Sequence, residues 1–179
     1  MGPLLAITRV IDRFNAGFGA LAAAAVFIAC LVSAGNATVR YLVSLSSNAW
    51  LEIQWYLFAA CVMLGSSDVL RLNEHVRVDV LYGRLSGRGK AWVDLFGFVF
   101  FLLPVTALIA VMAWPWFVEA WTRGEHSGNA GGLIRWPVKL LLPLGFGLLV
   151  LQGLSETIKR VAYLRGLLAM DIHYERPLQ

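Results

Sequence analysis

Charged residues are scarce in this sequence. Only 15% of its 179 residues are Asp, Glu, Lys or Arg, whereas a soluble domain carries about 25%. Hydrophobic residues make up 59% of the chain, and the mean hydropathy is +0.68. Two long runs carry no charge: 26 residues from Phe14 to Val39 and 24 from Leu95 to Val118. Because about 20 apolar residues cross a bilayer core, the composition excludes a soluble enzyme and predicts an integral membrane protein.

Residues that carry chemistry are also scarce. The chain has two cysteines, Cys30 and Cys61, whose spacing matches no metal site. Its three histidines lie in predicted loops or in the tail, which argues against a haem-binding membrane cytochrome. No nucleophile–base pair and no phosphate-binding glycine loop is evident. We therefore expect no enzymatic activity, no cofactor and no metal site.

Ionisable residues are missing from the middle of every predicted span. A carboxylate near the midplane would be a functional-site hypothesis by default, and a self-contained proton-coupled pump or small multidrug exporter needs one. The acidic residues nearest to the spans all lie within a turn or two of a span end, namely Glu52, Asp68, Asp94, Glu119 and Glu156.

What the sequence does contain is a pattern of four spans in one membrane domain covering residues 1–179. We predict an all-α membrane protein with transmembrane helices at about 14–39, 48–70, 92–118 and 137–160. A loop at 71–91 and a tail at 161–179 complete it. Asn48 suits an N-cap, and residues 3–13 are amphipathic, which suits a short helix lying in the interface. The first apolar run exceeds the 7–15 residues usual in a signal peptide, so we expect no cleavage.

The distribution of Lys and Arg predicts the orientation. Eleven of the fifteen lie in the N-terminal segment, in the 71–91 loop, or from the last residues of the fourth span onward (Lys159, Arg160, Arg165 and Arg176). Under the positive-inside rule both termini are therefore cytoplasmic. This bias and anionic lipid explain the net charge of +4, so we expect no nucleic-acid partner.

Several features point to helix packing. Ala25, Ala29, Ser33 and Ala37 recur every four residues, which either lets another helix approach closely or reflects only the abundance of alanine in membrane helices. Arg40 and Glu52 flank a short loop and either pair or stand as independent interfacial charges.

Prolines and glycines interrupt the last two spans. Pro104 predicts a distortion in the middle of the third. Pro143, Gly145 and Gly147 in the fourth would mark either a substrate-binding break or, as we favour, a packing adaptation. In the middle loop, residues 73–80 alternate polar and apolar, and we expect a short interfacial helix or turn that makes contacts rather than binding a metal.

Taken in order, these segments resemble the small membrane subunit (DctQ-type) of tripartite ATP-independent periplasmic (TRAP) transporters. The resemblance is carried by residues 52–58, Leu64-Gly65 and 74–80. The third loop adds 125–127, 131–133 and 136–139, leading into 143–146. It covers about residues 10–165.

The resemblance implies a function. In these transporters a periplasmic binding protein captures an organic anion and a large multispan subunit moves it, driven by a sodium gradient. The small subunit is a four-helix scaffold without a substrate or sodium site. Its implied partners are the large permease subunit, the transiently bound periplasmic protein and membrane phospholipids, in a bacterial inner membrane. Residues 46–50 and 132–137 are similar to a branch associated with 2-oxo and 2-hydroxy monocarboxylates.

Carried over to this chain, the family's characteristic positions suggest subunit contact, lipid anchoring or bundle structure rather than catalysis. These positions are Glu52, Trp55, Gly65, His75, Arg77, Asp79 and Gly132, and Arg40 and Trp136 are two further candidates for the same roles. The main alternative is a self-sufficient four-span homo-oligomeric channel or carrier. A role as an assembly or signalling factor is a third.

Overall fold

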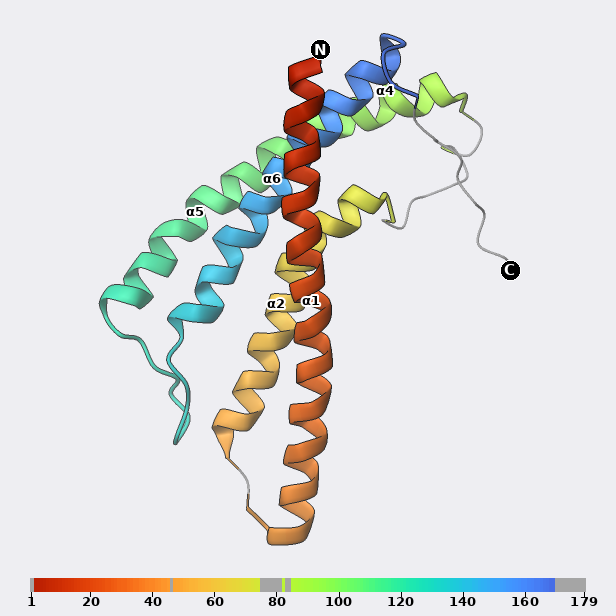
Figure 1. Ribbon diagram of the computed structural model, residues 1–179. Helices are drawn as coiled ribbons and strands as arrows, with labels where there is room; N and C mark the ends of the chain where they lie inside the picture. Colours follow the sequence, from red (N-terminus) through yellow and green to blue (C-terminus); the bar gives the residue numbers. More distant parts are fainter. Residues whose placement is uncertain (1, 46, 75–81, 83–84, 170–179) are drawn as a thin grey trace.

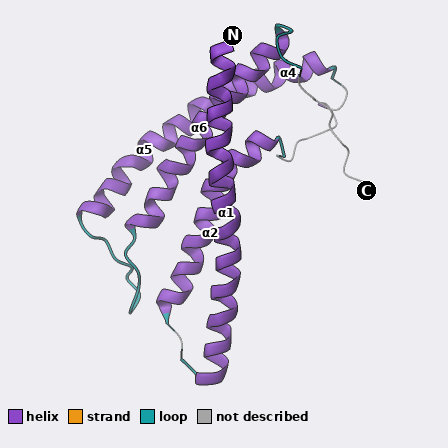
Figure 2. Cartoon of the chain, viewed as in Figure 1, coloured by secondary structure: helices purple, strands orange, loops and turns teal. Residues whose placement is uncertain are grey.

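The computed structural model describes residues 2–45, 47–74, 82 and 85–169. Within these ranges the chain is helical and contains no strand (Figure 2). Its elements are α1 (Gly2–Val43), α2 (Asn48–Leu72), α4 (Gly87–Gly97), the π-helical segment η1 (Phe98–Leu102), α5 (Leu103–Thr122) and α6 (Trp136–Leu164). They provide four helical stretches long and apolar enough to cross a membrane, with α4, η1 and α5 forming the third. The all-α prediction with four spans is confirmed.

The first helix is much longer than the predicted span. α1 has 42 residues, which at about 1.5 Å per residue exceeds a hydrocarbon core of about 30 Å. Residues 3–13, predicted to form a short interfacial helix, are helical and continue into the first span without a break. No proline separates them from Phe14. Thr8 and Asn15, two turns apart on one face, are both buried in this continuous helix.

The second helix begins at Asn48 as predicted, but its N-cap is Ser47. The Ser47 hydroxyl accepts a hydrogen bond from the Ala49 amide at 3.3 Å. Asn73 ends the helix in the left-handed region, with φ of 61°. Its amide donates to the Leu70 carbonyl, which satisfies one of the carbonyls that a helix end leaves open.

The third span is distorted where the sequence predicted it. The Leu103 amide donates to the Phe98 carbonyl five residues earlier, which makes a π-turn of Phe98–Leu102. Pro104 follows directly and has no amide hydrogen to continue the ordinary helical pattern. A widened turn therefore accommodates the proline inside an otherwise continuous helix.

The helices form an open row rather than a closed four-helix bundle. α6 packs against α1, α2, α4 and α5, whereas α5 makes its main contacts between spans with α6. The α5–α6 pair diverges from the α1–α2 pair toward the end that holds the turns after α1 and α5, which we call the loop end (Figure 1). The start of α1 and the end of α6 lie at the opposite end. Ala22, Leu64 and Leu148 form the core where α1, α2 and α6 meet.

Small residues set the spacing of these helices. A Cβ on Gly65 would lie 3.3 Å from Ala22 Cβ, and one on Gly145 would lie 2.7 Å from the Met63 carbonyl oxygen. Pro143 and Gly145 lie inside an unbroken α6, which supports the packing interpretation over a substrate-binding break. Of the predicted stripe of small residues, Ala25 is buried, whereas Ser33 and Ala37 are exposed and border a groove between α1 and α2.

Candidate functional site

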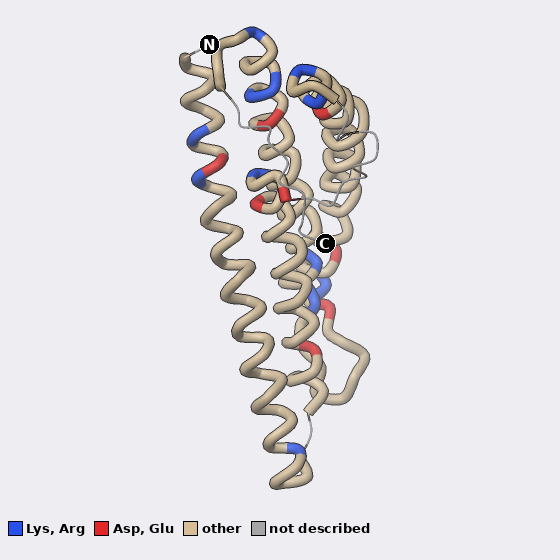
Figure 3. The backbone as a smooth tube through the Cα atoms, turned by 90° about the vertical axis from the view of Figure 1, so that its right-hand side faces the viewer, with Lys and Arg blue, Asp and Glu red and all other residues tan. Residues whose placement is uncertain are grey.

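The charged residues of α1 lie near its two ends, with a long uncharged stretch between them (Figure 3). Two clusters result. The loop anchor, at the loop end, consists of Glu52, Ser127, Asn129 and Leu133. The polar network, toward the other end, consists of Asp12, Asn15, Asp94, Gln152, Ser155, Glu156, Lys159 and Arg160.

Glu52 is the centre of the loop anchor. It lies in the second turn of α2 and is 4% exposed. Its Oε2 accepts a hydrogen bond from the Leu133 amide at 2.7 Å. Its Oε1 accepts from Asn129 Nδ2 at 2.8 Å and from the Ser127 hydroxyl. One carboxylate therefore joins three donors of the loop between α5 and α6, and charge-assisted hydrogen bonds of this kind are among the stronger ones in proteins.

The same face of α2 makes two further contacts with this loop. Asn48 Nδ2 donates to the Ala130 carbonyl at 3.0 Å, and the Tyr56 hydroxyl donates to the Ile134 carbonyl at 3.1 Å. Asn48, Glu52 and Tyr56 are four residues apart, so they line one side of the helix. The loop is thus fastened along the first three turns of α2.

The loop also has internal structure. The Ser127 amide donates to the Leu133 carbonyl at 2.9 Å, and the Arg135 amide donates to the Glu125 carbonyl at 2.8 Å. Gly132 lies at its tightest point, since a Cβ there would come within 2.5 Å of Ser127 Cβ. A larger residue at this position would displace Ser127, which is one of the donors to Glu52.

Aromatic side chains connect α5 and α6 at the loop end. The Trp136 ring packs edge-on against Trp121 with centroids 4.5 Å apart. Lys139 Nζ lies 4.4 Å from the centroid of Trp116 and pairs with Glu125. A cation held by both a ring and a carboxylate ties the first turn of α6 to the last turns of α5.

The possible pairing of Arg40 with Glu52 is not found. Both residues lie within the described ranges, and the Glu52 oxygens are occupied by the loop. Arg40 is exposed near the end of α1 and makes no ion pair with any described residue. The sequence prediction overlooked the loop because its donors lie more than 70 positions away from Glu52.

The polar network joins α1, α4 and α6. Lys159 bridges Asp12, at 3.1 Å, and Glu156. Arg160 bridges Asp94, at 3.0 Å, and Glu156, at 3.1 Å. Two cations therefore alternate with three carboxylates, and the side chains of Arg160, Asp94 and Glu156 are at most 7% exposed.

Uncharged groups complete this network. Gln152 Nε2 donates to Asp12 at 2.9 Å and to Glu156 at 3.0 Å. Its Oε1 accepts from Asn15 Nδ2 at 2.7 Å, and the Ser155 hydroxyl donates to Asp12 at 2.9 Å. Gln152, Asn15 and Ser155 are completely buried. Among the described residues, the Asn15 Oδ1 atom is buried without a hydrogen-bond partner. The other polar contacts of the network fix the relative position of the helices that carry them.

Sequence reasoning treated the charges of this network as separate groups at span ends. A signal was nevertheless present: Gln152, Ser155, Glu156 and Lys159 recur at helical spacing, so they share a face of α6. Their partners on α1 and α4 could not be identified, because periodicity gives the face of a helix and not its neighbour.

The remaining candidate residues are dispersed. Trp55 is 66% exposed on α2. Gly65 faces Ala22, and Trp136 begins α6. His75, Arg77 and Asp79 lie outside the described residues.

The comparisons with known proteins agree with this architecture. Residues 29–162 match the family model described as "Tripartite ATP-independent periplasmic transporters, DctQ component". Neither the curated proteins nor the solved structures contain a match to this chain. The matched range includes α2, α4, η1 and α5 completely, together with the loop anchor and most of α6. The chain therefore belongs to the DctQ family and is a multi-pass membrane component of a TRAP transporter.

Proposed function

We propose that this protein is a non-catalytic scaffold for the large permease subunit of a sodium-coupled transporter for organic acid anions. The cargo class suggested by the sequence is 2-oxo or 2-hydroxy monocarboxylates. The complex lies in a bacterial inner membrane, with both termini of this chain cytoplasmic and its loop end facing the periplasm. There the fastened loop offers a docking surface to the substrate-binding protein.

The polar network is the observation that carries the scaffold role. Its carboxylates contact cations or amides of the same chain, and these contacts join three helical elements at a buried position. Such an arrangement favours a fixed spacing of helices. A carrier that moves cargo by itself needs polar side chains that exchange partners during transport. A scaffold beside a moving domain needs polar side chains that keep the same partners.

The open helix row supports the same role. α5 has large side chains exposed along its length, including Leu108 at 59%, Val111 at 71% and Met112 at 68%. A broad apolar flank of this kind enlarges the surface that a fixed subunit presents within the bilayer.

Affinity purification of the full chain from its native membrane in mild detergent tests the proposal. We expect a large membrane protein of about a dozen spans in stoichiometric amount. Uptake of a 2-oxo or 2-hydroxy monocarboxylate by cells should require this chain, the large subunit, the binding protein and a sodium gradient together. Recovery of the chain only with itself, combined with flux through the purified chain in liposomes, would contradict the proposal and support a homo-oligomeric carrier.

A further inference from the structure

Arg40 differs electrostatically from its neighbours at the loop end. Four cations and three carboxylates lie there: Arg40, Arg123, Arg135 and Lys139 with Glu52, Glu119 and Glu125. Arg123 pairs with Glu119 at 3.0 Å, and Arg135 and Lys139 pair with Glu125. Glu52 is held by the loop. Within the described part of the chain, Arg40 is thus the cation at this end that has no carboxylate.

A groove lies beside this unpaired guanidinium. It has a volume of about 540 Å³ and runs between the end of α1 and the start of α2. Its lining is mixed, with polar Asn36, Arg40 and Gln54 beside apolar Ala37 and Leu51.

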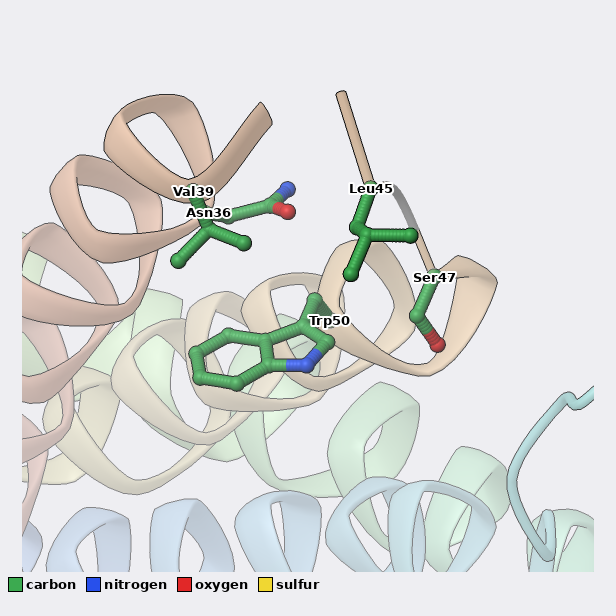
Figure 4. Close-up of a pocket in the computed structure, with 5 residues that line it drawn as sticks. All are labelled: Asn36, Val39, Leu45, Ser47 and Trp50. Atoms are coloured by element: carbon green, nitrogen blue, oxygen red, sulfur yellow. The ribbon is translucent and has the colours of Figure 1, made fainter. Parts of the chain in front are cut away.

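A second hollow continues from Asn36. It has a volume of about 350 Å³ and is bordered by Asn36, Val39, Leu45, Ser47 and Trp50. Figure 4 shows the Trp50 indole forming its floor, with Val39 and Leu45 above the ring and the Asn36 amide turned toward the space between them. The two hollows together place one cation and two amides, those of Asn36 and Gln54, next to an aromatic and aliphatic surface.

The depth of Arg40 indicates which ligand this surface meets. The uncharged run of α1 ends at Val39, and its 26 residues are long enough to cross the hydrocarbon core, with a length of about 39 Å. Arg40 therefore lies at the level of the headgroups. The phosphate of a phospholipid is the anion most abundant at that level, and a guanidinium binds phosphate oxygens in a bidentate manner.

We propose that the cleft between α1 and α2 at the loop end binds a phospholipid, with its phosphate on Arg40 and Asn36 and its apolar part along Trp50 and Val39. This inference does not depend on the transport role, since a phospholipid bound here would hold the α1–α2 hairpin at a fixed depth in any membrane complex.

Native mass spectrometry of the purified full chain tests the site. The protein is taken from nanodiscs of phosphatidylethanolamine and phosphatidylglycerol in equal parts, and the phospholipids retained on release are counted. We expect Arg40→Gln to weaken retention of one phospholipid about tenfold, as for loss of one charge-assisted hydrogen bond. Arg40→Lys should keep most of it, and Asn36→Ala should give a smaller loss.

Arg123→Gln is the matched control, since Arg123 is a 76% exposed cation at the same end that already has a carboxylate partner. It should retain phospholipid like the wild type. Equal retention by Arg40→Gln and the wild type would overturn the proposal, as would equal losses in the Arg40 and Arg123 variants. Retention of an organic acid in place of a phospholipid would also overturn it. Because Arg40 is exposed, its substitution leaves the fold intact, and unchanged co-purification with the large subunit would separate this site from the scaffold role.

Discussion

The Leu133 amide donates a 2.7 Å hydrogen bond to Glu52 across 81 positions of sequence. The loop between α5 and α6 has few apolar side chains. This contact and those of Ser127 and Asn129 hold it against α2 as an ordered surface. Replacing the carboxylate by a methyl group removes the acceptor of all three donors at once.

We therefore expect Glu52→Ala to release the loop while the helices stay assembled. Limited proteolysis of the detergent-solubilised chain should cut between residues 124 and 135 on the order of tenfold faster, since the loss of charge-assisted hydrogen bonds favours the open loop. Glu119→Ala is the control, because Glu119 is a 52% exposed carboxylate at the same end that contacts Arg123. An unchanged cleavage rate in Glu52→Ala would mean that Asn48 and Tyr56 suffice to hold the loop.

Arg160 is expected to be the most sensitive position of the polar network. Arg160→Met removes the guanidinium that pairs with Asp94 and Glu156 in a site that is at most 7% exposed. Removing one member of a buried ion pair costs about 3–5 kcal/mol, so the variant should show a clearly lower Tm in detergent. Arg165→Met, an exposed arginine just beyond the same helix, should leave the Tm nearly unchanged. Similar Tm values for the two variants would show that the network contributes little.

The spans could be predicted from sequence because each is a local property. Hydropathy located four segments. Most of the helices run beyond their predicted limits, and at the start of α1 the flanking Asp12 finds a partner inside the protein. The continuity of α1 through Arg13 could not be predicted from its amphipathic start. An interfacial helix and the first turns of a long transmembrane helix have the same periodicity.

The two polar clusters were beyond sequence reasoning for a different reason. Glu52 was identified as a candidate position, yet its partners follow from how the loop folds back, and no local rule gives that path. In the polar network the spacing of Gln152, Glu156 and Lys159 indicates a common face. That this face meets Asp12 is a property of the packed helix row.

The orientation of the chain in the membrane gives a further prediction. An alkaline phosphatase fusion after Gly128, in the loop at the loop end, should be active because the enzyme folds in the periplasm. A fusion after Leu164, at the end of α6, should be inactive, in accord with the excess of Lys and Arg at that end. The opposite pattern of activities would reverse the proposed topology and remove the loop as a docking surface for a periplasmic protein.

Gly145 and Gly147 form a natural matched pair on α6. A Cβ on Gly145 would meet the Met63 carbonyl oxygen at 2.7 Å, whereas one on Gly147 would meet no atom within 4 Å. Gly145→Ala should therefore push α2 away from α6 and destabilise the chain by about 1–3 kcal/mol, the usual cost of overpacking. Gly147→Ala should be neutral or stabilising by up to about 1 kcal/mol, because alanine has the higher helix propensity. Thermal unfolding of both variants in one detergent measures the difference, and equal Tm values would show that α2 and α6 do not need this close approach.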